Sequence, residues 1–303
     1  MKSDLIRPND TYDLPSPITT LTPAQQAQVI NLVRRAAQSE IMPRYQNLAD
    51  FEIASKSRDD DLVTQADLAA EAMITRGLLR LFPNAQVVGE EAVAKTPDLR
   101  DTMSDHEFTF VIDPIDGTWN YAKGVAVFGV ILSVLRFGVP VFGILYDPMR
   151  DDYVIADHAT QSTRFVPARG AARTLTTASE KSVEDLQGYV HLGLMPKDVQ
   201  FELAPVLPNF RRTTVLRCSC HEYRLIALGH ADFCLSATLN PWDHAAGVLA
   251  CQLAGGVAQF LDGSPYNARQ TTGYLLTATS QHTWDQIADL LRPILQNEPS
   301  KVG

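Results

Sequence analysis

The sequence predicts a mixed α+β and α/β protein in which sheets are covered by helices. Two observations lead to this prediction. Between residues 108 and 156, apolar runs rich in β-formers follow one another across short turns, which is typical of antiparallel strands. After about Ala171, short strand-like runs alternate with helical patterns, which is typical of an α/β layer. The 303 residues suffice for two modest domains or one large one.

Two helices are predicted at the start of the first half. Thr22 followed by Pro23 is typical of a helix N-terminus, and the apolar pattern continues until shortly before Pro43. A second helical pattern covers residues 67–81. The acidic run 59–61 between them lacks the glycine and the final glutamate of an EF-hand loop, so we interpret it as a solvated loop.

Strands dominate the rest of the first half. Gly138 and Pro140 are interpreted as a hairpin turn between two of them. The predicted strands cover residues 85–88, 108–112, 127–137, 139–146 and 152–156.

The second half is predicted to combine short strands with two helices. The helices cover 221–228 and 243–253, and Gly255 and Gly256 close the second one. Together these patterns divide the chain into an N-terminal extension (1–21), a first half (22–170) and a second half (171–303). The predicted strands of the second half cover residues 189–194, 213–217, 233–237, 257–261 and 273–278.

Composition restricts the class of function. A formal net charge of −9 disfavours broad attachment to nucleic acid or to an anionic membrane. The N-terminal 21 residues lack the apolar run of a signal peptide or spanning helix, so we expect a cytoplasmic protein. The four cysteines are too few for a disulfide framework, and Cys218, Cys220 and His221 lack a second ligand pair at zinc-finger spacing.

The segment Asp113-Pro114-Ile115-Asp116-Gly117-Thr118 is the most informative one. It directly follows the predicted strand 108–112, and Pro114 stiffens the turn, so both carboxylates are expected to converge outside the end of the sheet. Gly117 and Thr118 offer backbone N–H groups and a hydroxyl at a possible helix start, where a phosphate can be held.

Further carboxylates stand at comparable positions. Glu90 and Glu91 follow the predicted strand 85–88, and Asp243 starts the predicted helix 243–253. Oxygen ligands of this kind suit Mg²⁺. Taken singly, each acid has a plainer interpretation, because Asp67 and Asp243 stand where helix caps stand, and Glu90, Glu91 and Asp116 suit solvated turns.

Two competing phosphate chemistries fit the sequence poorly. There is no GxxxxGK[ST] segment, so a nucleotide-binding P-loop has no support. Asp113 and Asp116 are three positions apart, unlike the DxD pair of phosphatases that form an aspartyl-phosphate.

The order of these motifs resembles the inositol monophosphatase family of metal-dependent, lithium-sensitive phosphatases. The resemblance comprises Gly89-Glu90-Glu91, the 113–118 segment and Trp242-Asp243 with the following Ala-Ala-Gly, preceded by the DxVTxxD pattern at 61–67, and it covers about residues 22–282. It implies a layered α-β-α-β-α sugar-phosphatase fold and a homodimer.

The resemblance also implies roles for individual residues. Two or three Mg²⁺ ions per site would be held by Glu90, Asp113, the main-chain carbonyl of Ile115, Asp116 and Asp243. The catalytic residues would be Asp67, Glu90 and Thr118, with Thr118 hydrogen-bonded to Asp67 and the attacking water positioned by Thr118 and Glu90. Lys56 matches a lysine near the metal loop of the family, and a surface lysine is the plain alternative.

Substrate contacts are expected from two places. Asp116, Gly117 and Thr118 would face the phosphate. Ser236 stands seven positions before Asp243, where inositol-specific members often carry an acid, and this weakens the case for myo-inositol phosphate itself. His221, Glu222 or Arg224 are candidates for the leaving-group pocket, with structural positions as the alternative.

The function predicted from the resemblance is Mg²⁺-dependent hydrolysis of a small phosphorylated metabolite. Inositol 1-phosphate or a similar polyol or sugar phosphate is the first expectation. Histidinol phosphate, fructose 1,6-bisphosphate and 3′-phosphoadenosine 5′-phosphate are alternatives on the same metal site. A different class of function is a regulatory binding partner of the transcription machinery, for which the acidity of the chain argues against direct RNA contact but not against a protein partner.

Overall fold

The N-terminal helix begins as its sequence predicts. The computed structural model describes residues 20–56 and 61–295. In α1 (Pro23–Ala36), the Thr22 hydroxyl accepts the Gln25 N–H and the Gln25 side chain accepts the Thr22 N–H, which satisfies two N–H groups at the helix start. The helix continues as a π-helical turn, Ala37–Ile41. Except for Thr20 and Leu21, the predicted N-terminal extension lies outside the described residues.

The second helix, α2 (Gln65–Leu81), starts two residues earlier than predicted. Its N-cap is Thr64, and Asp67 is the reciprocal partner three positions later, accepting the Thr64 N–H. The preceding short strands β1 (Ile53–Ser55) and β2 (Leu62–Thr64) pair antiparallel and were not predicted, because each has only three residues. The chain therefore enters α2 from a small hairpin that lies beside the site.

A seven-stranded sheet forms the centre of the first half, and its last strand, β9, lies just beyond the predicted boundary at residue 170. Its order is β3-β4-β5-β6-β7-β8-β9, with β3 parallel to β4 and every other neighbouring pair antiparallel. All residues of β4 and β5 are buried, since both faces of the sheet are covered. The strands are β3 (Gln86–Gly89), β4 (Thr109–Asp116), β5 (Gly129–Arg136), β6 (Val139–Asp147), β7 (Asp152–Asp157), β8 (Ser162–Val166) and β9 (Arg173–Thr174).

The hairpin between β5 and β6 confirms the prediction that Gly138 is a turn residue and shows that the prediction for Pro140 is wrong. Phe137 and Gly138 adopt positive φ angles of 48° and 85°, as a two-residue turn between antiparallel strands requires. Pro140 does not belong to the turn. It lies in β6, paired with Leu135 where the register shifts, and this irregularity accommodates a residue without an N–H.

A five-stranded sheet forms the centre of the second half, in the order β11-β10-β12-β14-β13. The predicted strand 189–194 is too long, because the chain leaves the sheet after Val190 and forms a 3₁₀ turn, Leu192–Leu194. The strands are β10 (Gln187–Val190), β11 (Arg212–Thr214), β12 (Phe233–Ser236), β13 (Val257–Phe260) and β14 (Leu275–Ala278).

Six further helices occur in the described residues. The predicted helices 221–228 and 243–253 are found as α6 and α7, and α4 confirms the helix start expected at Gly117 and Thr118. Three helices were not predicted, α3, α5 and α8. The bounds are α3 (Glu90–Lys95), α4 (Thr118–Ala122), α5 (Lys197–Leu203), α6 (Ser219–Ala227), α7 (Pro241–Leu253) and α8 (Gln281–Leu295).

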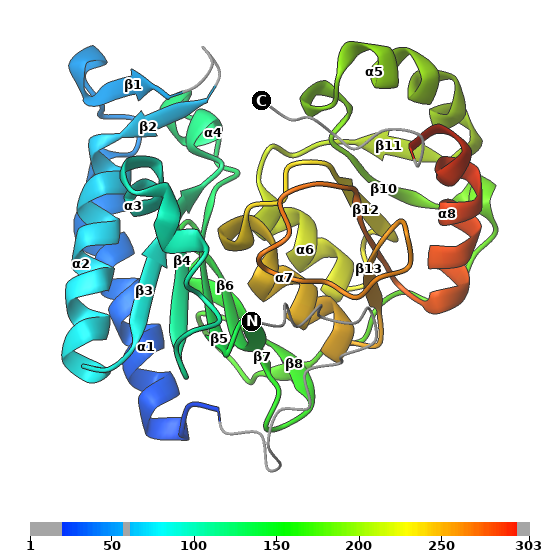
Figure 1. Ribbon diagram of the computed structural model, residues 1–303. Coiled ribbons are helices and arrows are strands. Elements are labelled where there is room, and N and C mark those ends of the chain that lie inside the picture. Colours follow the sequence, from blue (N-terminus) through cyan, green and yellow to red (C-terminus); the bar gives the residue numbers. More distant parts are fainter. Residues whose placement is uncertain (1–19, 57–60, 296–303) are drawn as a thin grey trace, which may run out of the picture.

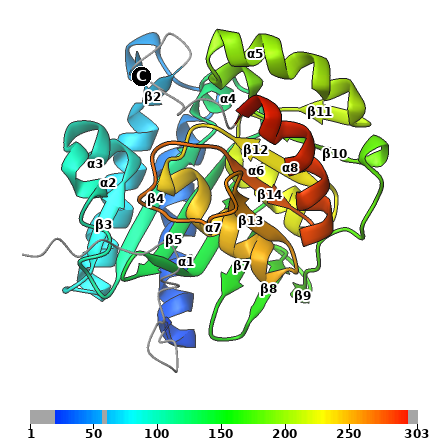
Figure 2. The ribbon, with the colours of Figure 1, turned by 45° about the vertical axis from the view of Figure 1, so that its right-hand side comes forward.

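The elements stack in five layers, α-β-α-β-α (Figure 1). Helices α1 and α2 cover the outer face of the seven-stranded sheet, α6 and α7 lie between the two sheets, and α5 and α8 cover the far face of the five-stranded sheet. In the turned view of Figure 2, α2 lies on the left of the molecule and α8 on the right, with β4 of one sheet and β12 of the other between them. Apolar cores fill the spaces between layers. This is the layered fold that the sequence resemblance implied.

The layering places the end of β4 and the start of α7 against each other, although 127 positions separate Asp116 from Asp243. None of the helices in the described part of the chain is long and apolar enough to cross a membrane.

Candidate metal centre

Two of the predicted metal ligands lie at the end of β4. Pairing with β5 runs regularly as far as Asp113, then shifts register before Asp116, so the strand contains an irregularity between the two acids. Gly117 then ends the strand with a φ of 87°. A Cβ at this position would also lie 3.0 Å from the Val127 carbonyl oxygen, so both the conformation and the close packing require glycine.

A further predicted ligand, Asp243, comes from the layer between the sheets. Asp243 lies in the first turn of α7, and Asn240 rather than Asp243 is the N-cap residue. The Asn240 amide donates to Asp243 Oδ2 at 3.2 Å. One carboxylate oxygen from each of Asp113, Asp116 and Asp243 lies within 4.8 Å of the others. The structure therefore brings together three of the acids that the motifs predicted.

The electrostatics of this cluster favour a cation. Burial, and then the charges of Glu90 and the neighbouring aspartates, raise the pKa of Asp113 well above its ordinary value. Burial likewise raises the pKa of Asp243, again with neighbouring carboxylates adding to the effect. The pKa of Asp116 rises to about 7, with burial as the main cause. Buried like charges repel unless a cation offsets them, so this donor set fits hard divalent ions such as Mg²⁺.

The cysteine segment supports Asp116 instead of forming a metal site of its own. The Cys218 thiol donates to Asp116 Oδ2 at 3.1 Å, and the Cys220 N–H donates to the same oxygen at 2.5 Å. His221 points elsewhere, with its Nε2 3.0 Å from the Phe128 carbonyl oxygen. All four cysteines are free and buried. Cys218 and Cys220 thus lie at the start of α6, in contact with Asp116 at the end of β4.

Glu90 is the first residue of α3 and lines the same cavity as the aspartates. Lys56 Nζ lies 2.7 Å from Glu90 Oε1 and 2.5 Å from Glu91 Oε1. The surface interpretation of Lys56 is therefore wrong, since only 17% of its side chain is exposed and it pairs with two acids. Although burial lowers the pKa of Lys56, these carboxylates raise it above its ordinary value overall.

Glu71 is a functional neighbour that sequence reasoning missed. Its carboxylate accepts the N–H groups of Glu91 and Ala92, both at 2.9 Å, and so caps the start of α3. A Cβ on Gly89 would lie 2.2 Å from the Glu71 carboxyl carbon. The available signal was helical spacing, because Glu71 lies one turn after Asp67 on α2. Glu71 therefore positions the helix that carries Glu90.

The predicted catalytic pair also comes together. The Thr118 hydroxyl lies 3.2 Å from Asp67 Oδ1 and 2.9 Å from the Ile115 carbonyl oxygen. The other Asp67 oxygen accepts the N–H and the hydroxyl of Thr64, at 2.9 and 2.6 Å. Burial raises the pKa of Asp67 to about 7 against these hydrogen bonds. Asp67 is thus fixed at one oxygen and directed toward Thr118 at the other.

A cavity of about 350 Å³ opens onto these groups and is lined by both halves of the chain. The Arg217 guanidinium lies 4.4 Å from the centre of the Trp119 ring, and both side chains line the cavity. The first half contributes Asp61, Leu62, Glu90, Asp113, Ile115, Asp116, Gly117, Thr118 and Trp119. The second half contributes His191, Gly193, Leu194, Val215, Arg217, Cys218, Ser219, Thr238, Asn240, Trp242, Asp243 and His244.

Three residues predicted to contact substrate are absent from this cavity lining. Ser236 is buried on β12, with its hydroxyl 3.5 Å from the Cys234 thiol. His221 is held against the Phe128 carbonyl on α6. Glu222 is fully buried and bonds His191 instead. In each case the side chain points into the packed layer around α6 and β12, which periodicity alone does not indicate.

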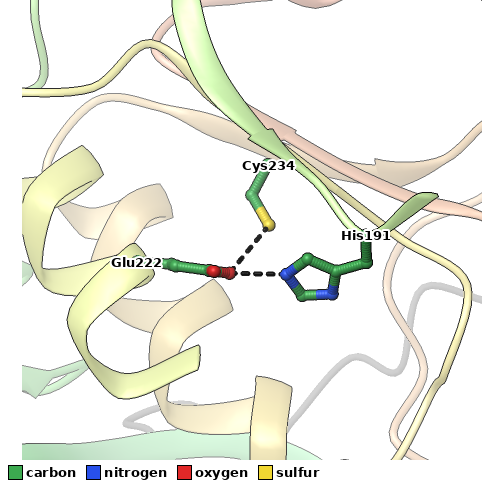
Figure 3. Close-up of side chains that lie close together, drawn as sticks. All are labelled: His191, Glu222 and Cys234. Atoms are coloured by element: carbon green, nitrogen blue, oxygen red, sulfur yellow. Dashed lines mark hydrogen bonds and ion pairs between the residues drawn. The ribbon is translucent and has the colours of Figure 1, made fainter. Parts of the chain in front are cut away.

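His191 is the cavity residue that the sequence gave least reason to suspect. It follows β10, and its ring points toward Glu222 of α6, with Cys234 of β12 beside the same carboxylate (Figure 3). No motif links these positions, which come together only through the pairing of β10 with β12 and the packing of α6.

Comparison with known proteins agrees with the fold. The inositol monophosphatase family profile matches residues 22–296. An inositol-1-monophosphatase of Synechocystis is 28% identical over 76% of this chain and 77% of its own length. The Nus factor SuhB of Escherichia coli is 29% identical over 78% and 87%, respectively. SaIMPase-II shares the fold, with a TM-score of 0.69 and 23% identity over 88% of this chain and 93% of its own.

The profile match covers nearly the whole described chain, and it includes every carboxylate that the structure gathers at the cavity. The chain therefore belongs to the inositol monophosphatase family.

Proposed function

We propose that the chain hydrolyses a small phosphate monoester with the help of bound Mg²⁺. The observation that carries this proposal is the cluster of two buried aspartates and one half-buried aspartate, facing a cavity that also contains Glu90 and Thr118. Asp113, Asp116 and Asp243, with Glu90 and the Ile115 carbonyl, would hold the two or three ions. When bound, such ions polarise phosphoryl oxygens and lower the pKa of water.

The protein groups around the cluster have separate tasks. Thr118, fixed by Asp67 and the Ile115 carbonyl, presents its hydroxyl oxygen to the cavity and orients the attacking water. Glu90, which lines the same cavity, would take the proton from that water. Lys56 holds the Glu90 carboxylate in place through a 2.7 Å ion pair.

The substrate we propose is inositol 1-phosphate or a similar polyol or sugar phosphate. A cavity of about 350 Å³ suits a small ligand. In support, the Synechocystis relative is named an inositol-1-monophosphatase, and SaIMPase-II has been solved with inositol monophosphate and with 2′AMP. The Escherichia coli relative is named a Nus factor, but the cavity and its carboxylates favour hydrolysis here over a regulatory role.

Phosphate release tests this proposal directly. The purified protein is assayed with inositol 1-phosphate, histidinol phosphate, fructose 1,6-bisphosphate and 3′-phosphoadenosine 5′-phosphate, in Mg²⁺, in EDTA and in Mg²⁺ with Li⁺. We expect Mg²⁺-dependent release that Li⁺ inhibits, and a loss of at least ~1000-fold in Asp113→Asn and Asp243→Asn. Release that is independent of Mg²⁺, or near-normal activity in either variant, would contradict the proposal.

The role of Thr118 has its own test. Thr118→Ala removes the hydroxyl that bonds Asp67, and we expect kcat to fall by ~100-fold or more while the Mg²⁺ concentration for half-maximal activity changes little. Thr118→Ser retains the hydroxyl and serves as the matched control. An unchanged kcat in Thr118→Ala would rule out its part in positioning water.

A further inference from the structure

His191 and Glu222 form a buried hydrogen-bonded pair at the wall of the cavity. His191 Nε2 lies 2.6 Å from Glu222 Oε2, and the other Glu222 oxygen accepts the Leu216 N–H at 2.7 Å (Figure 3). The Cys234 thiol lies 3.8 Å from Oε2. Glu222 is fully buried, whereas His191 also lines the cavity. The pair thus joins a buried carboxylate to a histidine ring at the cavity wall.

A metal ion does not explain this arrangement. Ligand atoms about 2.0 Å from a tetrahedral zinc ion lie about 3.3 Å from each other. The 2.6 Å between His191 Nε2 and Glu222 Oε2 is instead the length of a charge-assisted hydrogen bond. Burial raises the pKa of the Cys234 thiol, which keeps it a hydrogen-bond donor. We therefore interpret the group as an ion pair with a thiol beside it.

The pair places a positive charge at the cavity. Burial lowers the pKa of His191, whereas Glu222 and Cys234 together raise it, so that the pKa lies well above its ordinary value. The 2.6 Å contact with the buried Glu222 carboxylate pairs this ring with an anion, and we interpret the ring as an imidazolium. Because Nε2 is engaged with Glu222, the remaining ring N–H at Nδ1 is the donor available to a ligand.

Charges on the cavity wall differ between the two halves of the chain. The first half contributes the acids Asp61, Glu90, Asp113 and Asp116. In the second half, Asp243 is the acid among the described lining residues and belongs to the metal cluster, whereas His191 and Arg217 are cationic. Once cations neutralise the acidic cluster, the remaining wall of the second half favours an anion.

We propose that His191, held by Glu222, binds a second anionic group on the substrate, so that the preferred substrate is a phosphate monoester whose leaving group carries a carboxylate or another phosphate. This inference rests on the proposed function, phosphate monoester hydrolysis, and shifts the preferred substrate from inositol 1-phosphate to a sugar or polyol phosphate that carries a second anionic group. His191 is the residue that contacts the anion, and Glu222 is the positioning residue that fixes the ring and its charge.

Matched substrate pairs test the preference. Fructose 1,6-bisphosphate is compared with fructose 1-phosphate, and 2-phosphoglycerate with glycerol 2-phosphate, at saturating Mg²⁺. The first pair adds a phosphate and the second adds a carboxylate, so the two arms distinguish the kind of anion. We expect kcat/KM of the wild type to be at least ~10-fold higher for the doubly anionic member of at least one pair, mostly through KM.

Three variants separate specificity from structure. His191→Asn removes the cation and Glu222→Gln removes the carboxylate, and each is expected to reduce the ratio of kcat/KM between doubly and singly anionic substrates at least ~10-fold, mainly by raising KM for the doubly anionic member. Cys234→Ser retains the ion pair and should retain the preference. His191→Asn lies at the cavity wall, so it remains informative if Glu222→Gln fails to fold.

The outcomes are distinguishable. Hydrolysis with equal kcat/KM within both pairs overturns this inference and leaves the proposed function intact. A preference that survives in both His191→Asn and Glu222→Gln also overturns it. A stoichiometric zinc ion in the wild type that is lost in Cys234→Ser would contradict the ion-pair interpretation. If the wild type releases phosphate from no substrate in any assay, the proposed function fails, and this inference fails with it.

Discussion

At the scale of a single residue, Asp113 shows how a cluster of carboxylates lowers the stability of the folded protein when no cation is bound. Its carboxylate is buried beside Asp116 and Asp243, and its pKa is raised by burial and by these charges. Replacing it with asparagine removes one of the repelling charges at nearly constant volume. The same substitution removes a ligand, so its effects on the metal-free and the metal-bound states have opposite signs.

We predict that Asp113→Asn raises the melting temperature in EDTA and loses most of the stabilisation that Mg²⁺ gives the wild type. Each kcal/mol corresponds to on the order of 2 °C in a chain of this size. Thermal unfolding in EDTA and across Mg²⁺ concentrations measures both effects. Asp98→Asn, in a 3₁₀ turn whose residues are at least partly exposed, is the control and should change neither. A lower melting temperature in EDTA for Asp113→Asn would contradict the prediction.

The His191–Glu222 pair predicts a pH dependence of stability with a definite sign. The pKa of His191 in the folded state lies well above the value of about 6.5 expected when unfolded. The folded state therefore binds the proton more tightly, and the pair stabilises fully below pH 6.5. This contribution is lost as the pH rises through the folded-state pKa, by up to about 1.4 kcal/mol per pH unit.

Urea unfolding of the wild type and of His191→Asn measures this contribution. We expect the difference in unfolding free energy between the two proteins to be largest at pH 6 and to shrink steadily up to pH 9. His282→Asn, at an exposed position of α8, provides the matched histidine control. A difference that grows with rising pH would show that His191 is neutral in the folded protein.

At the scale of elements, α3 is a six-residue helix held at its first turn by another helix. Its N–H groups at Glu91 and Ala92 are satisfied by Glu71 of α2, and Gly89 leaves the space that this carboxylate fills. A helix this short is unstable alone, so tertiary hydrogen bonds determine where Glu90 lies.

We predict that Gly89→Ala displaces Glu71, because the new Cβ would lie 2.2 Å from its carboxyl carbon. Loss of two charge-assisted hydrogen bonds should cost about 2–4 kcal/mol and weaken Mg²⁺ activation several-fold. Denaturant unfolding and Mg²⁺ titration of activity measure the two effects. Gly193→Ala, with no atom within 4 Å of its added Cβ, should leave stability unchanged. Wild-type stability in Gly89→Ala would show that Glu71 does not cap α3.

Elements with strong local signals could be predicted from the sequence, and elements fixed by tertiary contacts could not. Thr22 and Pro23 predict the start of helix α1, and an apolar run before Asp113 predicts β4. Helix α3 carries no such pattern. The amphipathic spacing of α8, visible at Trp284, Ile287 and Leu291, was present but overlooked.

The same distinction between local signals and tertiary contacts applies to the residues of the site. Motif order predicts which acids lie together at the cavity, because each of them stands at an end of a strand or helix. Their role as metal ligands stays a prediction. The substrate wall does not follow from motifs, since His191 reaches Glu222 only through pairing of separate strands and packing of α6. Ser236, His221 and Glu222 were expected at this wall for their chemistry, and packing turned them inward.

At the scale of the whole molecule, the distance between two layers determines how close Asp113 and Asp116 lie to Asp243. Asp113 belongs to β4 in the seven-stranded sheet and Asp243 to α7, which packs on that sheet. The sheet and helix α7 pack closely where Gly143 of β6 faces Ala246 of α7. Because Ala246 lies one turn after Asp243, the packing at Gly143 helps to set where this carboxylate lies.

We predict that Gly143→Ala weakens metal binding without touching a ligand. The added Cβ would lie 3.0 Å from both Cα and Cβ of Ala246, so α7 must move by a few tenths of an ångström. We expect a stability loss of about 1–3 kcal/mol and a several-fold rise in the Mg²⁺ concentration for half-maximal activity.

A control variant separates this geometric effect from a general loss of stability. Ile287→Val shortens a buried side chain of α8, in the outermost layer, and should cost about 1 kcal/mol while leaving Mg²⁺ activation unchanged. Equal changes in Mg²⁺ activation for the two variants would mean that metal binding follows overall stability. If Mg²⁺ activation changes in Gly143→Ala alone, the spacing between the sheet and α7 sets the affinity of the aspartate cluster for Mg²⁺. The reason is that the two layers position acids that are far apart in the sequence.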